Sequence, residues 1–244
     1  MATLIQRVAQ HAYRTFARDL TDTSDSLFQE NIAFLGSLLS RVTAKDVNFD
    51  RNLVLNEQPV SVKTGVAPVT YIHLWDGDVF SMGIFVLKRG ARLPLHDHPG
   101  MFGLCRVIYG SVRVRSYSQV EGVSPHGNEA FRRLRELGML REAKKHVDKV
   151  VSEDDSCVVL TPSEGNIHEI TTESGPAAFI DILAPPYDER HGARRCNYFR
   201  DRGPLAEGQD ERLVVLEQVS QPIDYWCDSA FYLGPTINPY PSGT

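Results

Sequence analysis

Short runs of alternating apolar and polar residues fill most of the chain after Val66, and only one stretch with a helical pattern interrupts them. Successive side chains of a β-strand face opposite sides, so this alternation is typical of strands that bury one face. Turn residues such as Asp76-Gly77 and Arg89-Gly90 separate the runs. The sequence therefore predicts an all-β barrel or sandwich. The expected strands are 69–75, 79–88, 104–117, 157–161, 168–172, 177–183 and 213–219.

Two helices are expected within residues 1–50. The second follows a start signal at Ser24 and Asp25. Its apolar residues recur at helical spacing and are Phe28, Ile32, Leu35, Leu39 and Val42. Residues 1–18 carry arginines and no acidic residue, and their apolar face consists of Ile5, Val8, Ala12 and Phe16. Packing against the barrel is the preferred interpretation of this stretch, and a mitochondrial presequence is the alternative.

The composition is that of an ordinary folded protein. Of 244 residues, 42% are hydrophobic and 23% are charged, which indicates a single domain rather than a disordered chain. We expect its barrel to span residues 66–220. The net charge of −5 and the lack of a basic stripe argue against nucleic-acid binding. No apolar stretch is long enough for a membrane-spanning helix, and no exposed apolar seam is evident, so a monomer is expected.

The four cysteines are widely spaced and form no C-x-x-C pair. This pattern suggests neither a disulfide framework nor a zinc ribbon, and it favours a reducing compartment, the cytoplasm or the nucleus.

Residues 121–146 interrupt the strand pattern with a polar, partly helical stretch. We expect a solvated excursion from the barrel, and a surface that docks a partner is the alternative. Its arginines and lysines are interrupted by Glu129, Glu136 and Glu142, so a nucleic-acid site is not expected there.

Three histidines form the most informative local pattern. His96 and His98 are one residue apart, and His168 follows seventy residues later. On a strand, a His-x-His pair places both rings on one face and sends Asp97 to the other. Each histidine alone could be an ordinary surface or core residue. Together they predict a metal site shared by two strands.

The surroundings of these histidines resemble the two motifs of the cupin superfamily. The matching positions are Gly90, His96, His98 and Gly110 in the first motif and Pro162, Gly165 and His168 in the second. The resemblance implies a cupin barrel, which is a double-stranded β-helix of the jelly-roll type, with short N-terminal helices packed outside. Most such motifs have a glutamate where this chain has Gly103. Loss of that carboxylate leaves three neutral imidazoles, which is the arrangement of the thiol dioxygenases.

Longer segments are similar to the 2-aminoethanethiol (cysteamine) dioxygenase and plant cysteine oxidase family. They comprise residues 94–101, 109–113, 160–162 and 178–188, and the similarity extends to Trp226-Cys227. The resemblance implies Fe(II) as cofactor, O₂ as co-substrate and oxidation of a thiol to a sulfinic acid. Three neutral imidazoles would leave the ion its full charge, which favours binding and deprotonation of the thiol.

The implied substrates are of two kinds. One is cysteamine, which would give hypotaurine. The other is the N-terminal cysteine of peptides and proteins, where oxidation would create a signal for degradation and make the enzyme an oxygen sensor. Both present a thiol two carbons from a free amine.

Asp181 is expected to share a strand face with Phe179 and Leu183. A carboxylate on an apolar face needs a partner, because burying an unpaired charge is costly. Asp181 is therefore expected to line the cavity and either orient a ligand histidine or meet the amine of the substrate. A salt bridge to an arginine elsewhere is the alternative.

Three further residues are candidates for the site. In the family, a cysteine and a tyrosine near the iron can join as a thioether, and Cys196 and Tyr198 match these positions. A buried thiol beside a packed ring is the alternative for this pair. Tyr187 is expected at the cavity mouth, and anchoring of its own loop is the alternative.

Two functions from other classes remain open. A non-catalytic cupin would use the barrel to bind a small ligand or a partner. A zinc or nickel cupin would carry out isomerase or hydrolase chemistry, since three imidazoles can also hold those ions.

Overall fold

A computed structural model describes most of the chain, and the statements below refer to these residues. They are 2–17, 25–55, 60, 65–120, 129–188, 192, 194–205 and 210–240. The helices are α1 (Leu4–Phe16), α2 (Ser26–Ser40), α3 (Asn52–Leu55) and α4 (Glu129–Glu136). The strands are β1 (Val69–Asp76), β2 (Ser81–Leu87), β3 (Arg92–His96), β4 (Phe102–Tyr109), β5 (Ser111–Gln119), β6 (Leu140–Ser152), β7 (Val158–Leu160), β8 (Ile167–Thr172), β9 (Ala177–Ala184), β10 (Tyr198–Pro204), β11 (Leu213–Val219) and β12 (Cys227–Ala230).

The strands form two sheets that face each other. Sheet I has the order β12-β1-β2-β9-β4-β7, and sheet II closes on itself in the order β10-β11-β6-β5-β8-β3. One apolar cluster contains residues from both sheets, including Phe179 of sheet I and Val114 of sheet II, so the sheets enclose a common interior. The expected all-β barrel, with two facing sheets and helices packed outside, is thereby confirmed.

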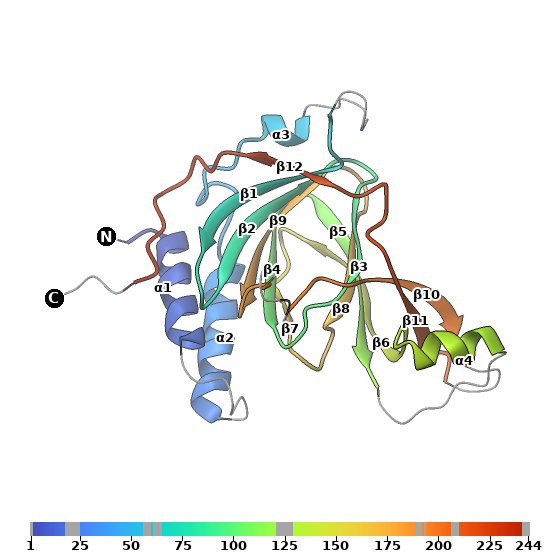
Figure 1. Ribbon diagram of the computed structural model, residues 1–244. Coiled ribbons are helices and arrows are strands. Elements are labelled where there is room, and N and C mark those ends of the chain that lie inside the picture. Colours follow the sequence, from blue (N-terminus) through green and yellow to red (C-terminus); the bar gives the residue numbers. More distant parts are fainter. Residues whose placement is uncertain are drawn as a thin grey trace.

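The two faces of sheet I bury different partners. Side chains alternate along β9, so Ile180 and Ile182 point outward and pack with the helices, whereas Phe179 points into the barrel. Helices α1 and α2 cover the outer face (Figure 1). The apolar face expected in the first helix, Ile5, Val8, Ala12 and Phe16, is fully packed there, and this confirms the packing interpretation.

The start of α2 also agrees with the sequence. Asp25 caps the helix, because its carboxylate accepts a hydrogen bond of 3.2 Å from the backbone N–H of Leu27. Ser24, the other residue of the expected start signal, lies outside the described residues.

The prediction of an excursion from the barrel at residues 121–146 was wrong for its last residues, 140–146. Residues 121–128 lie outside the described residues, and α4 accounts for the helical pattern. Residues 140–146, however, begin β6, which pairs with β5 and β11 inside sheet II. The middle of β6 is exposed on both faces, and its consecutive charged residues Lys144 and Lys145 hide the strand alternation in the sequence.

Other strand boundaries differ from expectation as well. The expected strand 104–117 is two strands, because Gly110 has a φ of +70° and turns the chain between β4 and β5. The sequence did not predict β10 or β12, and it predicted β3 only as a strand at His96 and His98, without bounds. None of the described helices is long and apolar enough to cross a membrane.

Candidate metal centre

The three histidines converge inside the barrel. Their ring centroids are 4.7–4.8 Å apart, and one nitrogen from each ring lies within 4.8 Å of the other two. All three residues are buried. The structure therefore brings together the three positions expected from the sequence, in an arrangement that could hold one metal ion.

Strand pairing places two of these rings side by side. His96 ends β3 and is the register partner of His168 on β8. His98 lies beyond the end of β3, in a turn where the N–H of Met101 donates to its carbonyl at 3.0 Å. The expectation that both members of the His-x-His pair lie on a strand was therefore wrong for His98, although the turn still directs its ring towards the others.

Hydrogen bonds fix which ring nitrogen carries the proton in two of the histidines. His96 Nδ1 lies 2.7 Å from the carbonyl of Pro94, and a carbonyl can only accept, so Nδ1 is the donor. Tyr187 donates its hydroxyl proton to the carbonyl of Asp97 at 2.6 Å. The same oxygen lies 2.9 Å from His98 Nδ1 and must accept from it. Both histidines therefore keep an unprotonated Nε2, the form that binds a metal.

The buried Nε2 of His98 has no hydrogen-bond partner among the described residues. An unsatisfied buried nitrogen costs free energy, and a bound cation would satisfy it. This atom is the clearest sign that the three residues fit a metal ion.

Burial keeps all three imidazoles neutral. It lowers the pKa of His96, and it lowers the pKa values of His98 and His168 well below the usual range, with the neighbouring histidines adding to the effect for the latter two. Neutral rings are required of metal ligands, because a protonated ring has no lone pair to donate.

No carboxylate joins the three rings from the position where cupins usually have one. Gly103 occupies that position, and a Cβ atom there would lie 2.8 Å from Cγ of Leu160. Leu160 is buried, so its side chain fills the space that a ligand from this position would need. The centre is therefore built from three neutral donors.

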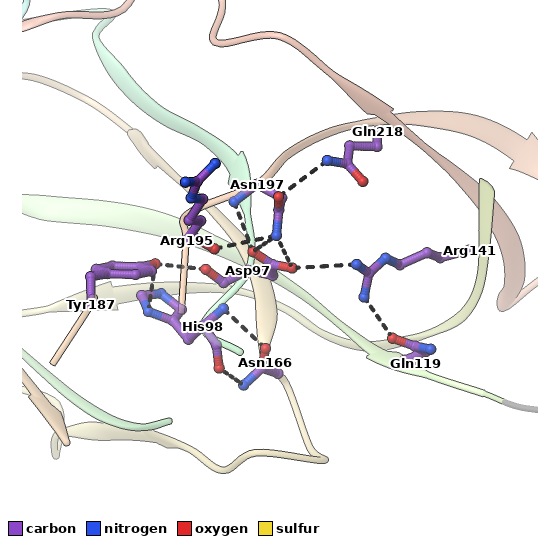
Figure 2. Close-up of polar contacts among 9 residues, drawn as sticks. All are labelled: Asp97, His98, Gln119, Arg141, Asn166, Tyr187, Arg195, Asn197 and Gln218. Carbon is purple, nitrogen blue, oxygen red and sulfur yellow. Dashed lines mark hydrogen bonds and ion pairs between the residues drawn. The ribbon is translucent and has the colours of Figure 1, made fainter. Parts of the chain in front are cut away.

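Asn166 connects the two histidine segments, as Figure 2 shows. Its Oδ1 accepts from the N–H of His98 at 3.0 Å, and its Nδ2 donates to the carbonyl of His98 at 2.7 Å and to that of Thr161 at 3.1 Å. Because Asn166 lies two residues before His168, these bonds fix the two segments relative to each other. No residue pattern in the sequence predicts this role of Asn166.

Asp97 points away from the metal-binding rings, as the sequence predicts. It accepts from the backbone N–H of Asn197 at 2.9 Å and from the Asn197 amide at 3.1 Å, and it lies 4.0 Å from Arg141 (Figure 2). Burial raises its pKa, while the bonds from Asn197 and the charge of Arg141 oppose that rise. Asp97 thus connects the end of β3 to the segment before β10.

Asp181 lies on the inner face of sheet I, as the alternation along β9 requires. Its neighbours in the sheet are β2 and β4, and the residue is not fully buried. Burial raises its pKa to about 7. Among the described residues it forms no ion pair, which removes the alternative of a salt bridge to an arginine in that part of the chain.

Tyr187, Cys196 and Tyr198 lie around the histidines. Besides the bonds to His98 and Asp97, the Tyr187 hydroxyl shares a hydrogen bond with the thiol of Cys196, and burial raises its pKa well above the usual range. Tyr198 is the register partner of His96 and continues the row of His168 and Ser116 across sheet II. Its ring centroid is 6.1 Å from that of Tyr225.

The C-terminal strand adds residues that the sequence analysis missed. β12 pairs with β1, and Tyr225, just before it, lies between Tyr198 and the thiol of Cys227, whose Sγ is 3.5 Å from the Tyr225 hydroxyl. Burial raises the pKa of Tyr225, with Cys227 as the next cause. No local pattern places residues 225–227 near His96, because the contact depends on pairing between distant strands.

Comparisons with known proteins agree with this geometry. Residues 38–237 match the family model PCO_ADO. The chain is 36% identical to mouse (Mus musculus) 2-aminoethanethiol dioxygenase and 34% identical to the human (Homo sapiens) protein of that name, in each case over 98% of this chain and 98% of the relative. It is 28% identical to plant cysteine oxidase 2 of Arabidopsis thaliana, over 96% of this chain and 83% of the relative.

Proposed function

The chain belongs to the PCO_ADO family, and on this basis we propose that it is an Fe(II)-dependent thiol dioxygenase. The reaction adds both atoms of O₂ to a thiol and yields a sulfinic acid. The observation that carries the proposal is the set of three buried, neutral imidazoles with no carboxylate from the Gly103 position.

His96, His98 and His168 would hold the ion through their unprotonated nitrogens. Bound Fe(II) would supply a site for the thiolate and the electrons that make O₂ reactive towards sulfur. The residues around it supply orientation: the Pro94 carbonyl fixes the ring of His96, Tyr187 fixes that of His98, and Asn166 holds the two segments at a constant separation.

Asp181 is proposed to meet the amine of the substrate. The ring nitrogens of His96 and His98 that do not face the metal already bond to Pro94 and Tyr187, so neither needs Asp181 for its orientation. It lies on the inner face of β9 and forms no ion pair with the described residues, so its carboxylate remains available to a substrate. A protonated amine two carbons from the thiol is a suitable counter-charge, and its binding would favour the ionised form of Asp181.

Tyr187 is proposed to position His98 rather than to react. Its single proton is donated to the Asp97 carbonyl, so the hydroxyl acts as an acceptor towards the site. The thioether between Cys196 and Tyr198 stays a prediction, and an intact-protein mass lower by two hydrogen atoms after aerobic turnover would support it.

Both expected substrate kinds fit an amine pocket beside a metal-bound thiol. Cysteamine is the smallest of them, and an N-terminal cysteine offers the same two groups on a peptide. Oxidation of protein N-termini would depend on oxygen and would make the protein an oxygen sensor acting through degradation signals.

Mass spectrometry tests the proposal directly. The Fe(II)-loaded protein is incubated aerobically with cysteamine and, separately, with a peptide that begins with cysteine, and His168→Ala serves as the control. We expect each product to gain two oxygen atoms only with the intact site, and the relative rates rank the substrates. Bound iron without any oxygen gain would refute the dioxygenase and favour a ligand-binding cupin, whereas tight zinc or nickel and no iron would favour hydrolase or isomerase chemistry.

A further inference from the structure

A glycine on β2 makes room for a tyrosine next to Asp181. Gly83 is the register partner of Asp181 on β9, so both face the barrel interior at the same level. A Cβ atom built on Gly83 would overlap the ring and hydroxyl of Tyr71. Tyr71 reaches this place from β1, where its own register partner is Phe85. The ring of Tyr71 therefore covers Gly83, which is the residue of β2 next to Asp181.

The aromatic packing of Tyr71 fixes its direction. Its ring centroid is 4.9 Å from that of Phe85, and Phe85 in turn stacks on the buried Phe179 at 5.4 Å. These rings belong to the apolar part of the barrel interior, so only the hydroxyl end of Tyr71 extends towards the level of Asp181.

The Tyr71 hydroxyl is available to a ligand. Within the described part of the chain it forms no hydrogen bond with another protein group, and the side chain is only partly buried. The Tyr71 ring occupies the place of a Gly83 side chain, and Gly83 is the register partner of Asp181, so the two groups lie close together. Burial, and next the negative charge of Asp181, raise the pKa of Tyr71 to about 12. The hydroxyl thus stays protonated at neutral pH.

We propose that the Tyr71 hydroxyl and the Asp181 carboxylate together bind the ammonium group of the substrate, and that Gly83 is the specificity-determining position that keeps this site open. The inference rests on the proposed function and assigns Tyr71 and Gly83 a role in recognising the free amine that both proposed kinds of substrate carry.

The chemistry of the two groups explains the selectivity. A primary ammonium has three N–H donors, and a carboxylate and a hydroxyl oxygen both accept. An acylated amine has no charge and a single donor, so it would leave Asp181 without a counter-ion. A substrate with a methyl group in place of the amine would leave both acceptors unpaired in a partly buried place. Sites of this kind reject analogues that lack the polar group.

Anaerobic titration calorimetry on the Fe(II)-loaded protein provides the test. The probes are cysteamine and propane-1-thiol, which has a methyl group where cysteamine has its amine. For Tyr71→Phe we expect the Kd of cysteamine to rise about tenfold, from the loss of one hydrogen bond to a charged group, and that of propane-1-thiol to change less than about twofold. Gly83→Ala should produce a larger rise for cysteamine, because it displaces the whole ring.

Matched controls separate this role from a general effect on the fold. Tyr13→Phe removes a hydroxyl on α1, outside the barrel, and Gly175→Ala adds a methyl group whose nearest neighbour is the end of Arg89 at 3.9 Å. Both should leave the two Kd values unchanged. Equal weakening of both thiols in Tyr71→Phe, or no weakening of either, overturns the proposal.

The same preparations are then exposed to oxygen and assayed for sulfinate. Oxidation by the wild type without any preference for cysteamine over propane-1-thiol would refute the amine site and leave the dioxygenase intact. A clear preference in binding without sulfinate would refute the dioxygenase and leave the amine site intact.

Discussion

Two layers of the same barrel interior have opposite character, although the same strands build both. On β8, Ile170 belongs to the apolar cluster between the sheets, and His168, two residues earlier, belongs to the metal centre. On β9, Phe179 is buried and Asp181 remains partly exposed. On β5, Val114 is buried in the apolar cluster, and Ser116 is the register partner of His168. We call these the apolar layer and the polar layer.

The two layers have different roles, because the apolar layer stabilises the fold and the polar layer carries the functional side chains. A step of two residues keeps a side chain on the inner face and moves it along the barrel axis. The apolar layer holds the two sheets together. The polar layer carries neutral imidazoles and, within the described part of the chain, a carboxylate that forms no ion pair and a buried nitrogen without a hydrogen-bond partner, all of which cost stability. Changes in the two layers should therefore have different consequences.

The largest effect is expected from His168→Ala in the polar layer. Loss of one of three ligands should lower metal affinity by more than the roughly 10–100-fold typical of residues that only orient a ligand, and turnover should fall below detection. Metal content by elemental analysis and oxygen consumption check this. His146→Ala, at an exposed position of β6, is the control. Normal metal content in His168→Ala would contradict the assigned ligand set.

Phe179→Ala in the apolar layer should act on stability instead. Removing a buried ring leaves a cavity and should cost about 3–5 kcal/mol in the free energy of unfolding, measured by urea denaturation. Phe34→Ala is the matched control, because this ring on α2 is 50% exposed. If both variants lost similar stability, the apolar layer would not have the role assigned to it.

Asn166→Ala tests the connection between the two histidine segments. Its hydrogen bonds to His98 and Thr161 orient the metal-binding loop, so metal affinity should fall about 10–100-fold while the ligands themselves remain. Competition with a chelator measures the change. Asn52→Ala, at the exposed start of α3, should leave the affinity unchanged. An unchanged affinity in Asn166→Ala would show that β3 and β8 fix the loop without it.

The smallest effect is a gain of stability in Asp181→Asn. Folding raises the pKa of Asp181 from 3.8 to about 7, so between pH 4 and pH 7 the folded protein binds more protons than the unfolded one. Wild-type stability should therefore fall as the pH rises through this window. In metal-free protein we expect Asp181→Asn to be more stable than the wild type by about 1–2 kcal/mol at pH 8 and by almost nothing at pH 4.

Urea denaturation at the two pH values measures that difference. A gain of equal size at pH 4 and pH 8 would mean that the raised pKa is not its cause. Asp228→Asn on the exposed β12 should show no gain at either pH.

Much of the polar layer could be predicted from the sequence, because its ligands occur in short motifs. The spacing of His96, His98 and His168 identifies the metal centre, and the alternation along β9 places Asp181 inside the barrel. Tyr71 could not be found in this way, since its role depends on the missing side chain of Gly83 on the neighbouring strand. Local sequence does not show which strands become neighbours.

The strands that the sequence predicted only in part or not at all have features in common. β3 contains Pro94, β6 and β10 carry many charges, and β12 has four residues. Their alternation is weak because each is short, interrupted by proline or exposed on one face, and they are strands because neighbours far away in the chain pair with them. The fold class depends on the stronger strands and could therefore be predicted without these four.

The pairing of β12 with β1 also sets an order of events during synthesis. β1 lies beside β2 soon after it is made, but its other edge is completed by residues 227–230. Domains form from the N-terminal part onward as the chain emerges, and contacts between distant segments come late. A growing chain therefore contains all three histidines well before Tyr225 and Cys227 arrive beside them, and the wall next to Tyr198 is the last part of the site to be built.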